Sequence, residues 1–390
     1  MIDPEALIAD VQALVRCPSV TGDERAVVET CAARAEALGL EAEVVVFDLD
    51  AVRAAPGYPG EEASRTELVA AVAVRRGSDP GAPRLAFNGH IDVVNEGSEQ
   101  WSFGPWSGER SDGFVYGRGS VDMKAGVAAA LHAAAAVERP HGDIVVVATP
   151  SEEDGGLGTF AALERDDDFA ACLIPEPTGF ELICAQAGAL TFAGEIRGRA
   201  AHAALRLEGE SAIDKYVPFH VALQEHERRL NTDVSHPLMR LHELPYPLLI
   251  GRLNAGRWSS QVPDRLEFEG RLGVPIGVRP EDARAELEEV AAQHGAAVSW
   301  AGGQFEPAET DHRHQFIDSV AAAAEEELGF APPLTGATYG SDMRLWAGRG
   351  IPCAMFGTRG IERAHGVDER VAEDEVVQVA RVMARVARGF

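Results

Sequence analysis

The sequence predicts an α/β protein in which a mostly parallel sheet flanked by helices is interrupted by an inserted α+β domain. In the first half of the chain, short apolar strands alternate with amphipathic helices, which is typical of a parallel sheet covered by helices. From about residue 188 the strands instead alternate polar and apolar residues, which favours an antiparallel sheet. The α/β pattern returns after Gly303. We therefore predict one discontinuous domain, residues 1–187 and 301–390, and an inserted domain, residues 188–300.

Local residue patterns predict each element in turn. A helix is expected from Pro4, because Asp3 before it is a good N-cap and the apolar residues that follow recur at helical spacing. The β-branched run at 143–148 predicts a strand that is buried on both faces. Further helices are predicted at 23–38, 127–136, 161–164, 211–230, 281–294, 315–328 and 373–387. Further strands are predicted at 43–47, 68–74, 85–87, 172–174, 189–197, 264–272, 297–300 and 353–356.

Composition and charge narrow the classes of protein to which this chain can belong. Its 390 residues carry a formal net charge of -27, which argues against nucleic acid or an anionic membrane as a partner. No apolar run reaches the roughly 20 residues that a membrane helix needs. The first residues do not resemble a signal peptide, and the five cysteines are too scattered for a disulfide framework or a thiolate zinc site. We expect a cytoplasmic protein.

A glycine-rich stretch at 117–126 presents Asp122 at the start of an Ala-rich helical segment. In isolation Asp122 has an ordinary interpretation as an N-cap, whose carboxylate accepts hydrogen bonds from the first amides of the helix. Other polar residues of the chain favour a second role, as a metal ligand. The two roles are compatible, because helix amides also stabilise negative charge nearby.

Further candidate ligands follow predicted strands. The pairs His90–Asp92 and Glu152–Glu153 and the single Glu176 come after the strands at 85–87, 143–148 and 172–174. In open α/β sheets, ligands bind at the carboxyl ends of the strands, so these side chains are expected to meet in one site. His365, which follows a glycine-containing loop, is the remaining candidate.

The residue types in this set suggest how the roles are divided. His90 and Asp92 lie on the same side of an extended segment, and a carboxylate commonly holds the second nitrogen of a ligating histidine. One of Glu152 and Glu153 is expected to bind metal, while the other serves as general base for a water molecule. Two histidines, three carboxylate ligands and a free base match a two-metal hydrolase, for which mixed nitrogen and oxygen ligands favour zinc.

The ordered set of motifs resembles the family of zinc aminoacylases and carboxypeptidases that includes acetylornithine deacetylase, succinyl-diaminopimelate desuccinylase and glutamate carboxypeptidase. The similarity extends over nearly the whole chain. The matching segments are 88–94 (Asn-Gly-His-Ile-Asp-Val-Val), 117–124 (Gly-Arg-Gly-Ser-Val-Asp-Met-Lys), 149–153 (Thr-Pro-Ser-Glu-Glu), 176–178 (Glu-Pro-Thr) and 364–365 (Ala-His).

The resemblance implies a role for each residue of the set. The ligands would be a bridging Asp122, His90 and Glu176 on one of two zinc ions in each subunit, and Glu153 and His365 on the other. Glu152 would be the catalytic base that deprotonates the bridging water, and Asp92 would assist by holding the histidine. Co²⁺ or Mn²⁺ are alternative metals, because the same ligands accept all three. The resemblance also implies a cis peptide between Asp122 and Met123.

The resemblance further implies that the inserted domain at 188–300 is a lid that forms a homodimer. His202 matches a histidine that polarises the scissile carbonyl, frequently across the dimer. Arg271 matches a lid arginine that commonly binds a substrate carboxylate, and Arg344 lies in a segment similar to the substrate-side loop of the desuccinylase branch. Ser260 stands where the family often has asparagine, which leaves that substrate contact open.

The predicted function is that of a di-zinc amidohydrolase that removes an N-acyl group from an amino acid or a related small amide, as a deacetylase or desuccinylase does. A metallo-dipeptidase or carboxypeptidase that cleaves a small peptide would use the same residues and differ only in the lid pocket. A phosphoesterase would need a further basic phosphate clamp, and none is evident beside the motifs. A catalytically silent binding protein on the same fold would be expected to lack a ligand or the base, and here none is missing.

Overall fold

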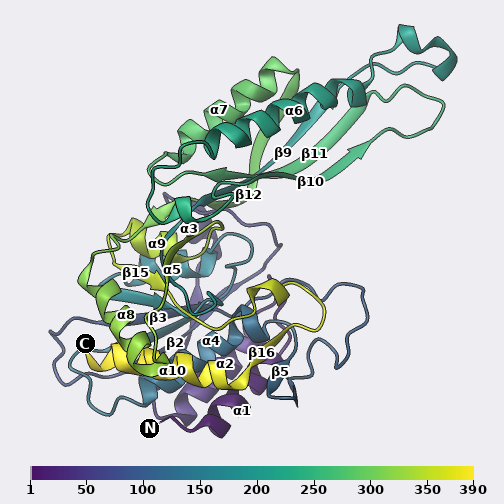
Figure 1. The fold of residues 1–390 in the computed structure, drawn as a ribbon. Helices are drawn as coiled ribbons and strands as arrows, with labels where there is room; N and C mark the ends of the chain where they lie inside the picture. Colours follow the sequence, from purple (N-terminus) through teal and green to yellow (C-terminus); the bar gives the residue numbers. More distant parts are fainter. Residues whose placement is uncertain (1) are drawn as a thin grey trace. The chain divides into compact units, whose positions relative to one another are not determined.

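The computed structural model describes residues 2–390 and shows two compact units (Figure 1). The larger unit comprises the chain up to Cys184 together with Glu309–Thr335 and Ser341–Phe390, and the smaller comprises Ala185–Ala308 and Gly336–Gly340. The smaller unit thus reaches further than the inserted domain predicted at 188–300. One reason is strand β12 (Ala296–Phe305), which continues past residue 300 and pairs with β9 (Gly188–Arg197) as far as Phe305. The catalytic and lid roles of the two units remain predictions.

A nine-stranded sheet lies at the centre of the larger unit, in the order β1-β2-β6-β3-β7-β15-β8-β13 with β14 paired to β8. The strands are β1 (Glu41–Phe47), β2 (Leu68–Arg75), β3 (Leu85–His90), β6 (Ile144–Thr149), β7 (Ala171–Ile174), β8 (Leu182–Gln186), β13 (Ala308–Glu309), β14 (Leu334–Ala337) and β15 (Cys353–Met355). Neighbours among β6, β3, β7 and β15 are parallel, whereas β1–β2, β2–β6 and β15–β8 are antiparallel. The predicted α/β class is confirmed, with a mixed sheet whose central strands are parallel.

Helices cover both faces of this sheet (Figure 1). On one face lie α1 (Pro4–Val15), α2 (Arg25–Ala37), α4 (Ala125–Ala135), α8 (Gln315–Leu328) and α10 (Glu373–Arg388). On the other lie α3 (Leu49–Ala54), α5 (Leu157–Arg165) and α9 (Met343–Gly348). A small sheet of β4 (Glu109–Ser111), β5 (Phe114–Tyr116) and β16 (Arg370–Ala372), together with the single turns η1 (Ser120–Lys124) and η4 (Ile361–Arg363), completes the unit.

Burial in the parallel part of the sheet agrees with the sequence patterns. Every residue of β6 is buried, as its run of β-branched residues predicts, and every residue of β3 and β7 is buried as well. Strand β3 continues beyond the predicted limit of residue 87 and ends at His90. Because β6, β3 and β7 are parallel neighbours, their carboxyl ends meet at one edge of the sheet.

The smaller unit is an antiparallel sheet in the order β10-β11-β9-β12, with two helices along one face (Figure 1). Its other elements are β10 (Leu248–Ala255), β11 (Arg265–Val274), α6 (Ala212–Leu230), α7 (Pro280–Gln293) and the turns η2 (Ala203–Glu208) and η3 (Met239–Leu241). Alternate residues of β9 and β11 pack under the helices, with Phe192, Phe219 and Phe268 in the core. The predicted α+β organisation is therefore present.

Strand β10 was not predicted from the sequence. It lies at the edge of the sheet, most of its residues are exposed, and its pairing with β11 shifts register between Ile250 and Arg252. An edge strand that is exposed on both faces does not need the alternation of polar and apolar residues that marks a half-buried strand. The glycine at 251, where the register shifts, interrupts the pattern further.

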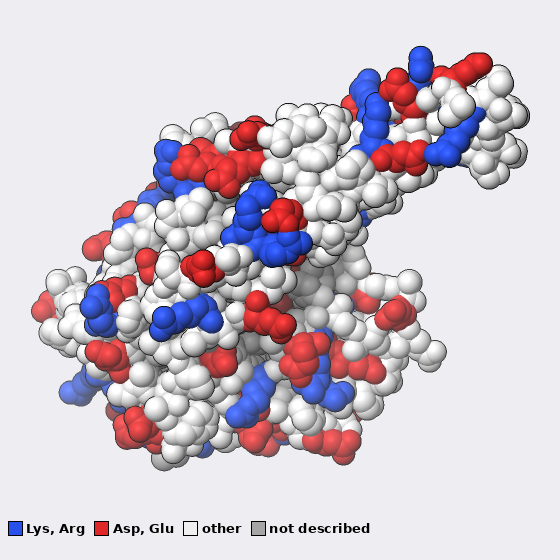
Figure 2. All heavy atoms as spheres, turned by 45° about the horizontal axis from the view of Figure 1, so that its top comes forward, with Lys and Arg blue, Asp and Glu red and all other residues white. Residues whose placement is uncertain are grey.

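Two further observations concern the surface. Figure 2 shows acidic and basic side chains interspersed over the face in view, without a broad basic patch there. No helix within residues 2–390 is long and apolar enough to cross a membrane.

Candidate metal centre

The turn that carries Asp122 is irregular. Gly119 has a left-handed backbone (φ 78°), and Asp122 and Met123 depart from helical angles within η1. The peptide between Asp122 and Met123 is cis, which confirms that expectation. The interpretation of Asp122 as an N-cap is wrong, because Lys124 occupies the N-cap of α4 and no side chain caps this helix. The Asp122 carboxylate is therefore available for other contacts.

The two carboxylate oxygens of Asp122 face different histidines. Oδ1 lies 3.0 Å from Nε2 of His90, and Oδ2 lies 3.4 Å from Nε2 of His365. The His90 nitrogen also lies 4.0 Å from Oε1 of Glu176, and the His365 nitrogen lies 3.1 Å from Oε1 of Glu153. The structure thus groups one histidine and one glutamate beside each oxygen of Asp122. The resemblance implies the same grouping, and the assignment of these residues as ligands remains a prediction.

Four parallel strands bring the two histidines and the two glutamates together. His90 is the last residue of β3, and Glu153 and Glu176 follow the carboxyl ends of β6 and β7. His365 lies in the segment after β15, the next parallel strand, beyond η4. The carboxyl edge of a parallel sheet is where open α/β proteins bind ligands, as the sequence analysis expected.

The buried His90 ring is held by its other nitrogen. Nδ1 lies 2.9 Å from the backbone carbonyl oxygen of Asp92 and 3.6 Å from the Asp92 carboxylate. The carbonyl, rather than the carboxylate, makes the short contact. Because a carbonyl can only accept, Nδ1 carries a proton. The Asp122 carboxylate, 3.0 Å from Nε2, also accepts a hydrogen bond, and this raises the pKa of His90 well above its usual value in spite of burial. When Nε2 loses its proton to a metal ion, the proton that stays on Nδ1 leaves the tautomer that a metal ligand needs.

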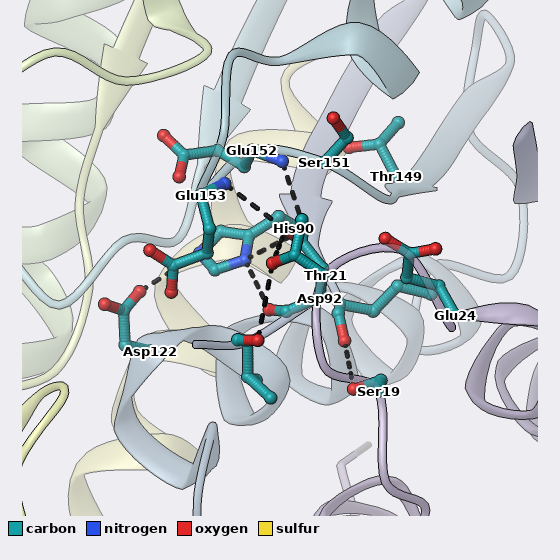
Figure 3. A network of polar contacts seen from close by, with 12 residues as sticks. Ser19, Thr21, Glu24, His90, Asp92, Asp122, Thr149, Ser151, Glu152 and Glu153 are labelled. Carbon is teal, nitrogen blue, oxygen red and sulfur yellow. Dashed lines mark hydrogen bonds and ion pairs between the residues drawn. The ribbon is translucent and has the colours of Figure 1, made fainter. Parts of the chain in front are cut away.

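The Asp92 carboxylate instead holds the turn that carries the two adjacent glutamates. It accepts hydrogen bonds from the backbone N–H groups of Glu152 (3.1 Å) and Glu153 (3.3 Å) and from the hydroxyl of Thr21 (3.0 Å), as Figure 3 shows. Asp92 itself is fully buried. A role in positioning both glutamates therefore adds to its predicted role beside His90.

Two further residues, which the sequence pattern did not indicate, support the same turn. Asp154 receives a hydrogen bond from Ser151 and forms an ion pair with Arg65, whose Nη2 lies 3.0 Å from both carboxylate oxygens. Asp154 also accepts hydrogen bonds from the backbone N–H groups of Glu62 (3.0 Å) and Ala63 (2.8 Å). Asp154 stood next to the acidic pair in the sequence, whereas nothing in the pattern around Arg65 pointed to this site.

The site concentrates buried negative charge. Glu152 and Glu176 are 9% and 6% exposed. Burial raises the pKa of Glu176 to about 8 and that of Glu152 well above its usual range, and neighbouring carboxylates act in the same direction. Hydrogen bonds to Asp122 and Glu153 raise the pKa of His365 to about 10. Cations would relieve the repulsion among these carboxylates. His90, Asp122 and Glu153 each offer one ligand atom, and these three atoms lie within 4.8 Å of one another.

The remaining predicted site residues are placed as follows. Arg344, in α9 of the larger unit, is buried and donates to the carbonyls of Gly155 (2.6 Å) and Ser341 (3.1 Å). In the smaller unit His202 and Ser260 are exposed and lie on adjacent segments, since the N–H of Ala203 donates to the Ser260 carbonyl (3.0 Å). Arg271 is an exposed residue of β11. Their predicted roles with substrate remain predictions.

Comparison with known families agrees with this arrangement. The model of peptidase family M20/M25/M40 matches residues 86–389, which include every predicted ligand. The chain belongs to this family. It is accordingly a hydrolase that acts on amide bonds, and the family includes dinuclear metal-binding members.

Related proteins are similar over their whole length. The chain is 31% identical to a succinyl-diaminopimelate desuccinylase of Paracoccus denitrificans (100% of this chain, 98% of the relative) and 30% identical to one of Methylorubrum extorquens (98% of each). Solved structures with the same fold include an M20 metallo-carboxypeptidase of Sulfolobus solfataricus (TM-score 0.78, 13% identity, 98% of each chain). Another is a dinuclear metal-binding M20 peptidase of Bacillus subtilis (TM-score 0.66, 18% identity, 99% of this chain and 97% of that one).

Proton release on metal binding tests the charge balance of the site. At pH 7 the metal-free protein holds protons on Glu176 and His365, whose pKa values lie at about 8 and about 10. A metal ion competes with these protons, so we expect Zn²⁺ binding to release protons and to tighten as pH rises from 6 to 8. Calorimetric titration in buffers of different ionisation enthalpy measures the number released. In Glu176→Gln this number should fall, and binding without any proton release would contradict the charge assignment.

Proposed function

We propose that this chain is a di-zinc amidohydrolase that removes an N-acyl group from an amino acid or a related small amide, in the manner of a deacetylase or desuccinylase. The observation that carries the proposal is Asp122, which lies between His90 with Glu176 on one side and His365 with Glu153 on the other. The sequence relatives named succinyl-diaminopimelate desuccinylase support this reaction class.

The donor set fits two divalent cations. Imidazole nitrogens and carboxylate oxygens are ligands that zinc accepts, and Co²⁺ or Mn²⁺ would also bind them. Burial raises the pKa values of Glu176 and Glu152, and bound cations would lower them. When bound, two such cations would polarise the scissile carbonyl and make a water molecule nucleophilic near neutral pH.

In this proposal Glu152 is the general base. Within residues 2–390 Glu152 forms no hydrogen bond or ion pair with either histidine, while Glu153 contacts His365. Its backbone N–H is held by the Asp92 carboxylate, so the point from which its side chain projects is fixed (Figure 3). Glu152 would accept the proton of the attacking water and pass it to the leaving amine.

Substitution of Glu152 separates the base from the ligands. We expect Glu152→Gln to keep both metal ions, because no predicted ligand is changed, and to lower kcat by about 10²–10⁴-fold. Metal content by elemental analysis and turnover of an N-succinyl amino acid are the two measurements. Glu99→Gln, at an exposed position outside the site, is the control. Full activity of Glu152→Gln towards any substrate that the wild type hydrolyses would refute the assignment.

The substrate class is a finer part of the proposal. Arg271 matches a lid arginine that commonly binds a substrate carboxylate, and Arg344 lies in a segment similar to the substrate-side loop of the desuccinylase branch, while Ser260 departs from the usual asparagine. Arg344 is buried in the larger unit, whereas Arg271 is exposed on β11, so Arg271 is the better candidate for the carboxylate. A metallo-dipeptidase or carboxypeptidase on the same site is the second candidate, because the family model covers peptidases.

A substrate panel distinguishes the two candidates. N-acetyl, N-formyl and N-succinyl amino acids are compared with dipeptides by kcat/KM, and we expect the N-acyl amino acids to be preferred. Arg271→Ala should raise KM for substrates with a carboxylate and leave kcat nearly unchanged, because it removes a binding contact. A dipeptide as the best substrate would favour the peptidase, and an unchanged KM would exclude this role of Arg271.

We also propose that the protein is a cytoplasmic homodimer formed through the smaller unit. Support comes from α6, where Ile213, Val217 and Val221 recur every four residues and are 44%, 57% and 58% exposed. Such a stripe of apolar residues on a surface helix is typical of a buried interface.

The dimer has a direct test. Val217→Glu would place a charge in the apolar stripe, so we expect it to shift the protein from dimer to monomer in sedimentation-velocity experiments. Val46→Glu, at an exposed valine of β1 in the larger unit, should leave the mass unchanged. A wild type that is monomeric at micromolar concentration would contradict the proposal, and so would a dimer that persists in Val217→Glu.

A further inference from the structure

A buried ion pair lies behind the proposed metal site and belongs to none of its predicted residues. Arg118 and Glu369 are 2% and 1% exposed, and Nη1 of the arginine lies 2.7 Å from Oε2 of the glutamate. Arg118 stands in the glycine-rich turn before Asp122, and Glu369 stands directly before β16. The pair thus joins two segments that are far apart in the sequence.

Glu369 holds the turn that carries Asp122. Its Oε1 accepts hydrogen bonds from the backbone N–H groups of Val121 (3.1 Å) and Asp122 (3.3 Å). Its backbone carbonyl accepts a third, from the N–H of Gly117 (2.9 Å). N–H groups at the start of a helical turn have no partner within it, so an external carboxylate is well suited to bind them. Glu369 therefore fixes the backbone from which the Asp122 side chain projects.

Arg118 holds the other segment. Its Nη2 donates to the backbone carbonyl of His365 (3.1 Å) and to that of Asn95 (3.3 Å). The guanidinium group also lies over the ring of Trp101, 5.2 Å from its centroid. His365 lies outside any helix or strand, has a positive φ of 61° and a half-exposed side chain, so its own segment holds it weakly. The Arg118 guanidinium group holds the segment by its hydrogen bond to the His365 backbone carbonyl.

We infer that Arg118 and Glu369 are a positioning pair that sets the distance between Asp122 and His365, and thereby the affinity for one of two metal ions. The inference rests on the proposed function, in which these two residues share that ion with Glu153. A guanidinium group suits this task because its planar set of donors can bind a carboxylate and a carbonyl at once in fixed directions. The ion that His90 and Glu176 would bind also shares Asp122, but it depends less on the pair, because its other two ligands lie at the end of β3 and just after β7.

Two conservative substitutions separate positioning from general stability. Arg118→Lys keeps the positive charge but loses the planar set of guanidinium donors. A single amine can then no longer donate to both the Glu369 carboxylate and the His365 carbonyl in fixed directions. Glu369→Gln keeps an acceptor for the N–H groups but loses the charge of the pair. The control is Arg110→Gln, in β4 of the neighbouring small sheet. It breaks the ion pairs of Arg110 with Glu5 of α1 and Glu373 of α10 at the surface.

The experiment is a calorimetric titration of the metal-free, full-length protein with Zn²⁺. For the wild type and for Arg110→Gln we expect two ions per chain. In Arg118→Lys and Glu369→Gln we expect one ion to bind as in the wild type and the other about 10–100-fold more weakly, which is the usual effect of losing a group that orients a ligand. Excess Zn²⁺ should then restore kcat in both variants. Circular dichroism and thermal unfolding in chelator check that each variant is folded.

The outcomes are distinct. Two ions of wild-type affinity in both folded variants would overturn the positioning role, and so would an equal loss of both ions, which indicates a general structural role. If Glu369→Gln fails to fold, Arg118→Lys decides. A wild-type chain that binds only one Zn²⁺ ion would overturn the di-zinc proposal and this inference together. Two ions without amide hydrolysis would overturn the proposed reaction and leave the pair to be judged by affinity.

Discussion

The repulsion among buried carboxylates around Asp122 is the constraint on which the rest of the site depends. Glu152, Glu153 and Glu176 share this region with only two histidines, and burial raises the pKa of each glutamate. Buried charge of one sign is costly unless it is paired, protonated or bound to metal. Such an arrangement favours a fold in which the carboxylates are held by the backbone rather than by one another, and in which cations complete the site.

The supports of the site meet this constraint in different ways. Parallel strands deliver His90, Glu153 and Glu176 to one edge of the sheet, so the ligands begin from rigid elements. The loops after these strands are held in place by hydrogen bonds between their backbone groups and buried charged side chains. Asp92 binds the amides of the glutamate turn, and the pair Arg118–Glu369 binds the turn of Asp122 and the segment of His365. The charged residues around the site are thus either hydrogen-bonded to backbone groups or joined in an ion pair.

Much of this could be predicted from the sequence, and the errors have physical causes. The α/β class and most elements follow from the spacing of apolar residues and from the runs that predict buried strands. That the candidate ligands lie close together follows from their positions directly after strands. All of these are local signals. The N-cap interpretation of Asp122 failed because a carboxylate at the start of a helix looks the same whether it faces the amides or turns away from them. Arg65, Asp154, Arg118 and Glu369 were not predicted to support the site, because their partners lie in other segments of the chain.

The sequence by itself determined which chemical groups are present, that they follow the strands of a parallel sheet, and the family to which their order belongs. Only the tertiary structure decided that Asp122 directs one oxygen to His90 and the other to His365, because the two histidines come from distant segments. It also decided that the Asp92 carboxylate holds the glutamate turn while its carbonyl holds His90. Hydrogen-bond partners depend on which segments the fold places side by side, and no local pattern encodes that placement.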